Sequence, residues 1–144
     1  MNKNKFLTTR SSGFTLIELL VVVAIIGILA AIGVVAYNGY VDSTKKKSTE
    51  NIMMQIGLAQ TEYYSDFGIY YHPGASCTPT AATSRAVEKE LLGGDGLTPS
   101  IITEELGFEI CVQQSGSSYL IKAVNSSGCK ISVDSNQAVL RENC

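Results

Sequence analysis

The chain has 144 residues, which suits one compact domain with an extended segment and leaves little room for a second domain. Hydrophobic residues make up 45% of the chain and charged residues 17%, a balance that is typical of globular proteins rather than disordered ones. The formal net charge of −2 would become −5 without the three N-terminal cations, which argues against a generally cationic DNA-binding surface.

An apolar stretch from Phe14 to Tyr37 follows a basic leader that ends at Gly13. No residue from Leu19 to Tyr37 is charged, and a helix of that length would span about 28 Å, enough to cross a bilayer core. The leader cations Lys3, Lys5 and Arg10 place the N-terminus in the cytoplasm. We therefore predict a single membrane-spanning helix, with the rest of the chain on the other side of the membrane.

A single carboxylate, Glu18, lies near the start of this apolar stretch. An ionised side chain near a bilayer interior costs roughly 2.5 to 3.5 kcal/mol, so it normally persists only where a partner or a function retains it. The alternative is an ordinary secretory signal peptide. The residues Ala30-Ala31-Ile32-Gly33 could mimic the cleavage site of such a peptide. Such a peptide has no reason to carry this carboxylate, so we favour a helix that the mature protein keeps.

The residues around Glu18 form the motif Gly13-Phe14-Thr15-Leu16-Ile17-Glu18-Leu19-Leu20, followed by an apolar run to Ile32. This motif resembles the prepilin signature of type IV pilins, closely from Gly13 to Tyr40 and beyond that only in architecture. The resemblance implies cleavage between Gly13 and Phe14 by a prepilin peptidase and methylation of the new Phe14 amine. Many relatives carry a proline in this helix, and its absence around Gly33 puts a proline-linked kink in doubt.

After cleavage, the Phe14 amine would lie one helical turn from Glu18 on the same face. The amine of a neighbouring copy could reach this carboxylate, and two unit charges about 4 Å apart attract by roughly 4 kcal/mol at an effective dielectric near 20. Repetition of such a step would build an open helical filament. Three other readings stay open, in which Glu18 pairs with its own amine, contacts lipid headgroups or favours the helix N-terminus.

The helical pattern continues past Tyr40. Apolar residues at Ile52, Ile56, Ala59 and Tyr63 predict one buried face, while Lys45 and Glu50 are assigned to the opposite, polar side. We expect one helix from Phe14 to about Asp66, ended by Gly68.

The next stretch is rich in turn residues, with Pro73-Gly74 a predicted turn. A helix is expected from Ser84 to Leu92, ended by Gly93-Gly94. A shorter helix is expected before Gly107, capped by Thr98 with Pro99 at its first position.

Apolar and polar residues alternate in the C-terminal part, which predicts strands. The alternating positions are Phe108, Ile110, Val112; Tyr119, Ile121, Ala123; and Ile131, Val133. Turns are expected at Ser115-Gly116, 125–128 and 134–136. The predicted fold class is α+β, a long N-terminal helical spine packed on an antiparallel sheet of three or four strands, as in a pilin.

Together with the resemblance, this fold divides the chain into a leader at 1–13 that would be removed, a hydrophobic transmembrane and filament-core helix at 14–41 and a globular domain at 42–144. Within the globular domain we expect the second half of the helix at 42–66, a connecting loop at 67–107 and the sheet with a disulfide-closed C-terminal region at 108–144.

All four cysteines follow the apolar stretch, on the side assigned to an oxidising compartment. Two disulfides are expected, and the sequence allows three connectivities. We favour Cys129 with Cys144 and Cys77 with Cys111. The resemblance to pilins, which commonly have a disulfide-closed C-terminal loop, supports the first pair more than the second.

Catalytic and metal sites have no positive signature. No Cys-x-x-Cys pair is present, His72 is the one histidine, and no nucleophile with an oriented base is recognisable. We expect no cofactor, no metal and no enzymatic activity. The basic run Lys45-Lys46-Lys47 could contact nucleic acid or anionic lipid, but a solvated helix face or a pair with Glu50 is favoured.

The resemblance implies a structural subunit of a type IV pilus that waits in the inner membrane and is then added to an extracellular filament. Its partners would be other copies of itself, the prepilin peptidase and the inner-membrane assembly machinery, and it would support adhesion, motility or DNA uptake. The alternatives are a pseudopilin of a type II secretion system and a minor DNA-binding or adhesive tip pilin.

Overall fold

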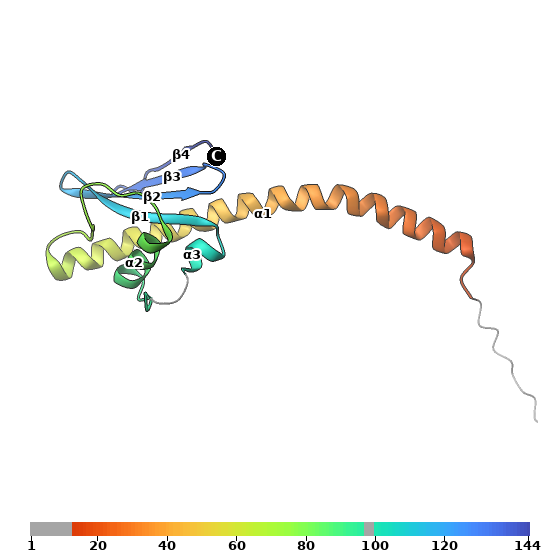
Figure 1. The fold of residues 1–144 in the computed structure, drawn as a ribbon, viewed down its shortest axis with the longest axis horizontal. Coiled ribbons are helices and arrows are strands. Elements are labelled where there is room, and N and C mark those ends of the chain that lie inside the picture. The colour runs from red at the N-terminus through yellow and green to blue at the C-terminus, as the bar shows by residue number, and fades with distance from the viewer. Residues whose placement is uncertain (1–12, 97–99) are drawn as a thin grey trace, which may run out of the picture. The chain divides into compact units, whose positions relative to one another are not determined.

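The computed structural model describes residues 13–96 and 100–144 (Figure 1). The chain divides into two compact units, the first ending at Tyr40 and the second comprising Val41–Cys144. Helix α1, Leu16–Phe67, contributes residues 16–40 to the first unit and residues 41–67 to the second.

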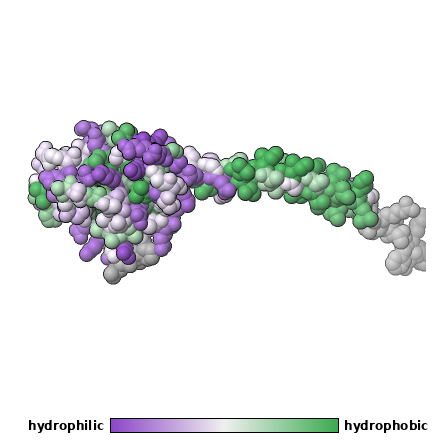
Figure 2. All heavy atoms as spheres, turned by 45° about the horizontal axis from the view of Figure 1, so that its top comes forward, coloured by the Kyte–Doolittle hydropathy of each residue, from purple (hydrophilic) through white to green (hydrophobic). Residues whose placement is uncertain are grey.

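In the first unit, α1 presents apolar side chains on all sides. Every residue from Gly13 to Tyr40 is exposed, and Figure 2 shows hydrophobic residues covering the visible face of this segment. The helix is unbroken through Gly33, Val34 and Val35. These residues therefore continue the helix where a proline would have removed a backbone hydrogen bond.

The second unit contains a four-stranded antiparallel sheet in the order β1-β2-β3-β4. The strands are β1 (Phe108–Ser115), β2 (Ser118–Asn125), β3 (Lys130–Asp134) and β4 (Val139–Glu142). The alternating residues predicted to face inward are buried, and Gly116 turns the chain between β1 and β2 with a φ of 60°. The predicted α+β fold is thus confirmed.

The hydrophobic core lies between α1 and the inner face of the sheet. Met53 and Ile56 of α1 are fully buried among sheet residues such as Ile121 and Val133. The buried hydroxyl of Tyr119 donates a 3.2 Å hydrogen bond to the carbonyl of Gly57. A side chain at position 57 would approach this hydroxyl to 3.3 Å, so the glycine permits close contact between the helix and β2.

The predicted buried stripe on α1 is rotated by about one residue. Ile56 is buried as expected, but Ile52, Ala59 and Tyr63 are only half-buried. The buried face instead contains Thr49, Glu50, Met53, Ile56, Gly57 and Gln60. The assignment of Glu50 to the solvent side was therefore wrong, and the reason is a partner on β4 that is described below.

Helix α1 ends as predicted at a glycine. Gly68 adopts a φ of 73°, and its N–H donates to the carbonyl of Tyr64 at 2.8 Å. The chain then returns along the helix, where Gln60 binds both the N–H and the carbonyl of Tyr71 at 2.8 Å. The buried Gln60 amide is thus satisfied by backbone groups of the returning loop.

The two short helices begin at different residues from those predicted. Helix α2, Ala81–Leu91, starts three residues earlier than expected because Thr80 caps it and Thr83 reciprocates. Helix α3, Ile101–Glu104, is capped by Ser100 rather than Thr98. The hydroxyl of Ser100 also donates to Glu88 of α2 at 2.7 Å, whereas Thr98 and Pro99 lie outside the described residues.

Helix α2 lies along the outer edge of β1 and satisfies part of that edge. The N–H of Ile110 donates to Ser84 Oγ at 2.8 Å, and the hydroxyl of Thr83 donates to the carbonyl of Ile110 at 2.8 Å. Farther along, the N–H of Gln114 donates to the carbonyl of Gly74 at 3.1 Å. Side chains and a loop therefore take the place of a fifth strand here.

Two disulfides fasten the second unit. Cys77 of the connecting loop is bonded to Cys111 of β1, and Cys129, just before β3, is bonded to Cys144. These are the pairs favoured from the sequence.

Candidate functional site: the N-terminal segment and the polar cluster at the C-terminus

The start of α1 is fixed by a reciprocal pair of side chains, Thr15 and Glu18. The N–H and the hydroxyl of Thr15 both donate to Oε2 of Glu18 at 2.8 Å, and the N–H of Glu18 donates to Thr15 Oγ1 at 3.2 Å. This is a capping box, which satisfies backbone donors that a helix N-terminus otherwise leaves unpaired. The helix begins at Leu16, directly after the capping residue Thr15, so Gly13 and Phe14 lie outside the helix.

Among the interpretations proposed for Glu18, these contacts agree with stabilisation of the helix N-terminus. The Phe14 nitrogen is here part of the peptide bond to Gly13. The signal for the cap was present in the sequence as Thr-x-x-Glu before an apolar run. The sequence-based interpretation that Glu18 favours the helix N-terminus did not include Thr15 as its partner.

The apolar surface that follows Glu18 is not covered within the first unit. Phe14 is 88% exposed, and the large apolar residues from Leu16 to Ile32 are all exposed. Helix α1 is long and apolar enough to cross a membrane, by length and composition. Gly27 and Gly33 have open space where a side chain would begin, so another helix could approach the backbone closely there.

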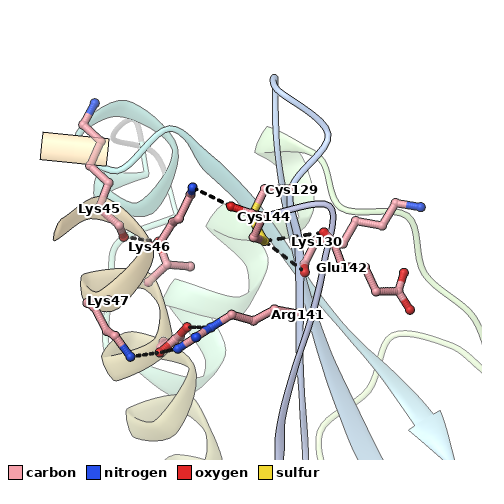
Figure 3. Close-up of polar contacts among 10 residues, drawn as sticks. Lys45, Lys46, Lys47, Cys129, Lys130, Arg141, Glu142 and Cys144 are labelled. Carbon is pink, nitrogen blue, oxygen red and sulfur yellow. Dashed lines mark hydrogen bonds and ion pairs between the residues drawn. A yellow bond between two sulfur atoms is a disulfide. The ribbon is translucent and has the colours of Figure 1, made fainter. Parts of the chain in front are cut away.

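The basic run of the sequence lies in the second unit and is largely occupied by contacts within the chain (Figure 3). Lys46 Nζ is 2.9 Å from Asp42 and donates to the carbonyl of Cys144 at 3.1 Å. Lys47 Nζ is 3.2 Å from Oε2 of Glu50, as one of the sequence-based readings proposed. Two of the three lysines therefore serve the fold, which weakens the interpretation of the run as a nucleic-acid contact.

Glu50 joins α1 to β4 through Arg141. The guanidinium of Arg141 contacts both carboxylate oxygens, with Nε on Oε1 and Nη2 on Oε2 at 2.8 Å. The Glu50 side chain is only 6% exposed, so these bonds compensate a carboxylate that is nearly removed from water. Hydrogen bonding by Arg141, with a smaller contribution from Lys47, lowers the pKa of Glu50 below its ordinary 4.5.

His72 and the tyrosines near it belong to the packing at the end of α1. Tyr70 stacks edge-on against Tyr119 with ring centroids 5.0 Å apart, and Tyr63 lies 5.7 Å from Tyr71. His72 is half-buried, and burial raises the pKa of the adjacent Tyr71. In residues 13–96 and 100–144, no three histidine, cysteine or acidic residues come together as metal ligands would.

Comparisons with known proteins agree with the N-terminal motif. Residues 8–34 match the family described as the prokaryotic N-terminal methylation motif. The chain is 33% identical over 102 residues to a fimbrial protein of Neisseria meningitidis, and 37% identical over 91 residues to the fimbrial protein EcpC of Eikenella corrodens. It is 39% identical over 80 residues to the type IV major pilin protein PilE of Neisseria gonorrhoeae.

These alignments cover 69%, 63% and 54% of the present chain, in the same order. The chain spans 58%, 60% and 47% of the length of the relatives themselves. No solved structure matches the chain. The methylation motif, the apolar helix with its α+β domain, and the similarity to major pilins and fimbrial proteins support the identification of the chain as a type IV pilin.

Proposed function

We propose that this chain is a structural subunit of a type IV pilus filament, cleaved before Phe14 and assembled through its N-terminal helix. The observation that carries the proposal is the exposed apolar surface of residues 14–40, which has one carboxylate near its start and overlaps the methylation motif matched at residues 8–34. An apolar surface of this kind needs a non-aqueous environment. A membrane would supply it before assembly, and the helices of other copies would supply it in the filament.

Leader removal by a prepilin peptidase would free the Phe14 amine, which would then be methylated. Glu18 Oε2 accepts both hydrogen bonds from Thr15, while Oε1 has no hydrogen-bond partner in the described part of the chain. The amine of a neighbouring copy could bind Oε1 while the capping box stays intact. The Coulomb attraction, roughly 4 kcal/mol at 4 Å, would offset the roughly 2.5 to 3.5 kcal/mol cost of keeping Glu18 in an apolar environment.

The transfer of the helix from lipid to a filament core exchanges one apolar environment for another. Bulk hydrophobicity therefore gives little drive, and helix packing together with Glu18 pairing would select the position of each copy. The chain would wait in the inner membrane as a single-pass precursor. The inner-membrane assembly machinery would then move it into an extracellular filament, where its role is structural rather than catalytic.

Mass spectrometry of filaments sheared from the cell surface tests this function. The expected product begins at Phe14, carries one added methyl group and both disulfides, and accounts for most of the filament mass. A surface product that begins beyond Ile32 would reject the proposal, because the apolar helix would then be a discarded export signal. A chain that starts at Phe14 but never leaves the membrane would reject the filament role alone.

A further inference from the structure

The outer face of the sheet carries a groove of about 590 Å³, between residues 77–79 and β4. Its floor includes Leu120 of β2 and Leu140 of β4, and Leu140 is 60% exposed. Lys122 and Lys130 line the same groove, and neither has an ion-pair partner among the described residues. We call this feature the sheet groove.

The charge of the sheet groove is positive. Glu142 is the one acidic residue of its lining and lies directly opposite Lys130 in the pairing of β3 with β4. Lys122 lies opposite Ser132 and Cys111 on the two neighbouring strands, so no carboxylate lies directly opposite it in the sheet. An apolar floor next to a lysine without a counter-charge favours a ligand that combines an apolar and an acidic group.

A surface of that composition is present elsewhere on the same chain. Ile101 at the start of α3 is 61% exposed, and the neighbouring Glu104 and Glu105 are exposed as well. Neither glutamate has an ion-pair partner in residues 13–96 or 100–144. We call Ile101, Glu104 and Glu105 the acidic knob.

The knob and the groove lie at opposite edges of the sheet. Helix α3 contacts β1, which is one edge strand, whereas Leu140 and Glu142 belong to β4, the other edge strand. One molecule therefore cannot place its own knob in its own groove. Two copies can make this contact in a head-to-tail manner, and such a contact does not close on itself.

We propose that the acidic knob of one copy docks in the sheet groove of the next copy, with Glu104 and Glu105 facing Lys122 and Lys130. This inference rests on the proposed function, since it requires a filament of repeated copies. It adds a lateral contact between globular units to the contact between apolar helices. The charges would fix the register of neighbouring copies, because a displaced neighbour would leave them unpaired.

Charge reversal of the full-length chain in the producing cell tests the contact. Variant K122E/K130E makes the groove acidic, and variant E104K/E105K makes the knob basic. Each variant alone should lower the yield of sheared filaments roughly tenfold or more, because like charges would then face each other at every contact. Expressed together, the two variants should recover filaments that contain both chains, since each knob then meets a groove of opposite charge.

The variant E62K/D66K reverses two exposed acidic residues of α1 outside both surfaces and serves as the matched control, with an expected yield close to wild type. Disulfide-bonded precursor in the membrane should be equal in all strains, which separates docking from folding. Wild-type yield from either reversed variant, or no recovery on co-expression, would overturn the docking proposal. If the unaltered chain itself forms no filaments, the proposed function fails instead.

Discussion

Arg141 of β4 holds the buried carboxylate of Glu50 on α1 from both oxygens, with Nη2 2.8 Å from Oε2. The two residues are far apart in the sequence, so their pair ties the last strand of the sheet to the first helical turns of the second unit. Cys144, three residues after Arg141, reinforces this tie. Its side chain forms a disulfide with Cys129, and its backbone carbonyl accepts a hydrogen bond from Lys46 of α1.

The Glu50 pair predicts a dependence of stability on pH. Because the pKa of Glu50 is lowered in the folded chain, the pair contributes fully above about pH 4.5 and is lost as the pH falls through the folded pKa. The free energy of unfolding should therefore fall more steeply with acid in the wild-type chain than in Glu50→Gln. Thermal unfolding followed by circular dichroism in detergent between pH 2 and pH 7 measures the difference.

At pH 7, Glu50→Gln should lower the free energy of unfolding by about 1 to 3 kcal/mol, since charged hydrogen bonds become neutral ones in a buried place. Glu62→Gln, at an exposed position of the same helix, is the control and should change little. Equal acid sensitivity in wild type and Glu50→Gln would contradict the assignment of this carboxylate.

The C-terminal disulfide should stabilise the chain mainly by restricting the unfolded state. Cys129 and Cys144 are separated by 15 residues, for which loop-closure entropy predicts about 3 kcal/mol. We expect the double variant Cys129→Ser, Cys144→Ser to lose about that amount in chemical denaturation. A reductant should then have a smaller effect on the variant than on wild type, because one disulfide is left to reduce.

Gly57 and Tyr119 should be energetically coupled. Alanine is favoured over glycine inside a helix by roughly 1 kcal/mol, but here the added carbon would meet the Tyr119 hydroxyl at 3.3 Å. Gly57→Ala should therefore bring little or no gain in the wild-type chain and about 1 kcal/mol more in a Tyr119→Phe background. A double-mutant cycle from denaturation curves gives the coupling, and strict additivity would disprove it.

Glu18 is expected to act in assembly beyond its role as a cap. Glu18→Ala should leave the precursor inserted in the membrane but greatly reduce filament yield. Thr15→Val removes the capping side chain and keeps the charge, so it isolates the capping term of about 0.5 to 2 kcal/mol. If Thr15→Val reduced the yield as much as Glu18→Ala, capping rather than pairing would be the function of the carboxylate.

The sequence predicted those elements whose cause is local. The strands followed from alternation at positions such as Ile110 and Val112, and the end of α1 followed from Gly68. The burial of Glu50 could not be read in this way, because it depends on Arg141, which the chain brings close only after folding. Gln60 is a similar case. Its buried amide is satisfied by the backbone of Tyr71, which lies close to it only in the folded chain.

The helix starts that were predicted wrongly have a related cause. The sequence predicts that α2 begins at Ser84, but the hydroxyl of Ser84 binds the backbone of Ile110 and the Thr80–Thr83 capping box begins the helix earlier. Ser84 and Thr83 therefore have a role in the sheet that periodicity does not reveal.

That role limits the pairing of further strands at one edge of the sheet. A strand with unpaired backbone groups at a sheet edge is a template for further strands, and crowded copies in a membrane would be exposed to that hazard. By binding the outward groups of Ile110, the hydroxyls of α2 make that N–H and carbonyl unavailable to another strand. An edge interrupted in this way is a poorer template for strand-by-strand growth than a fully unpaired one.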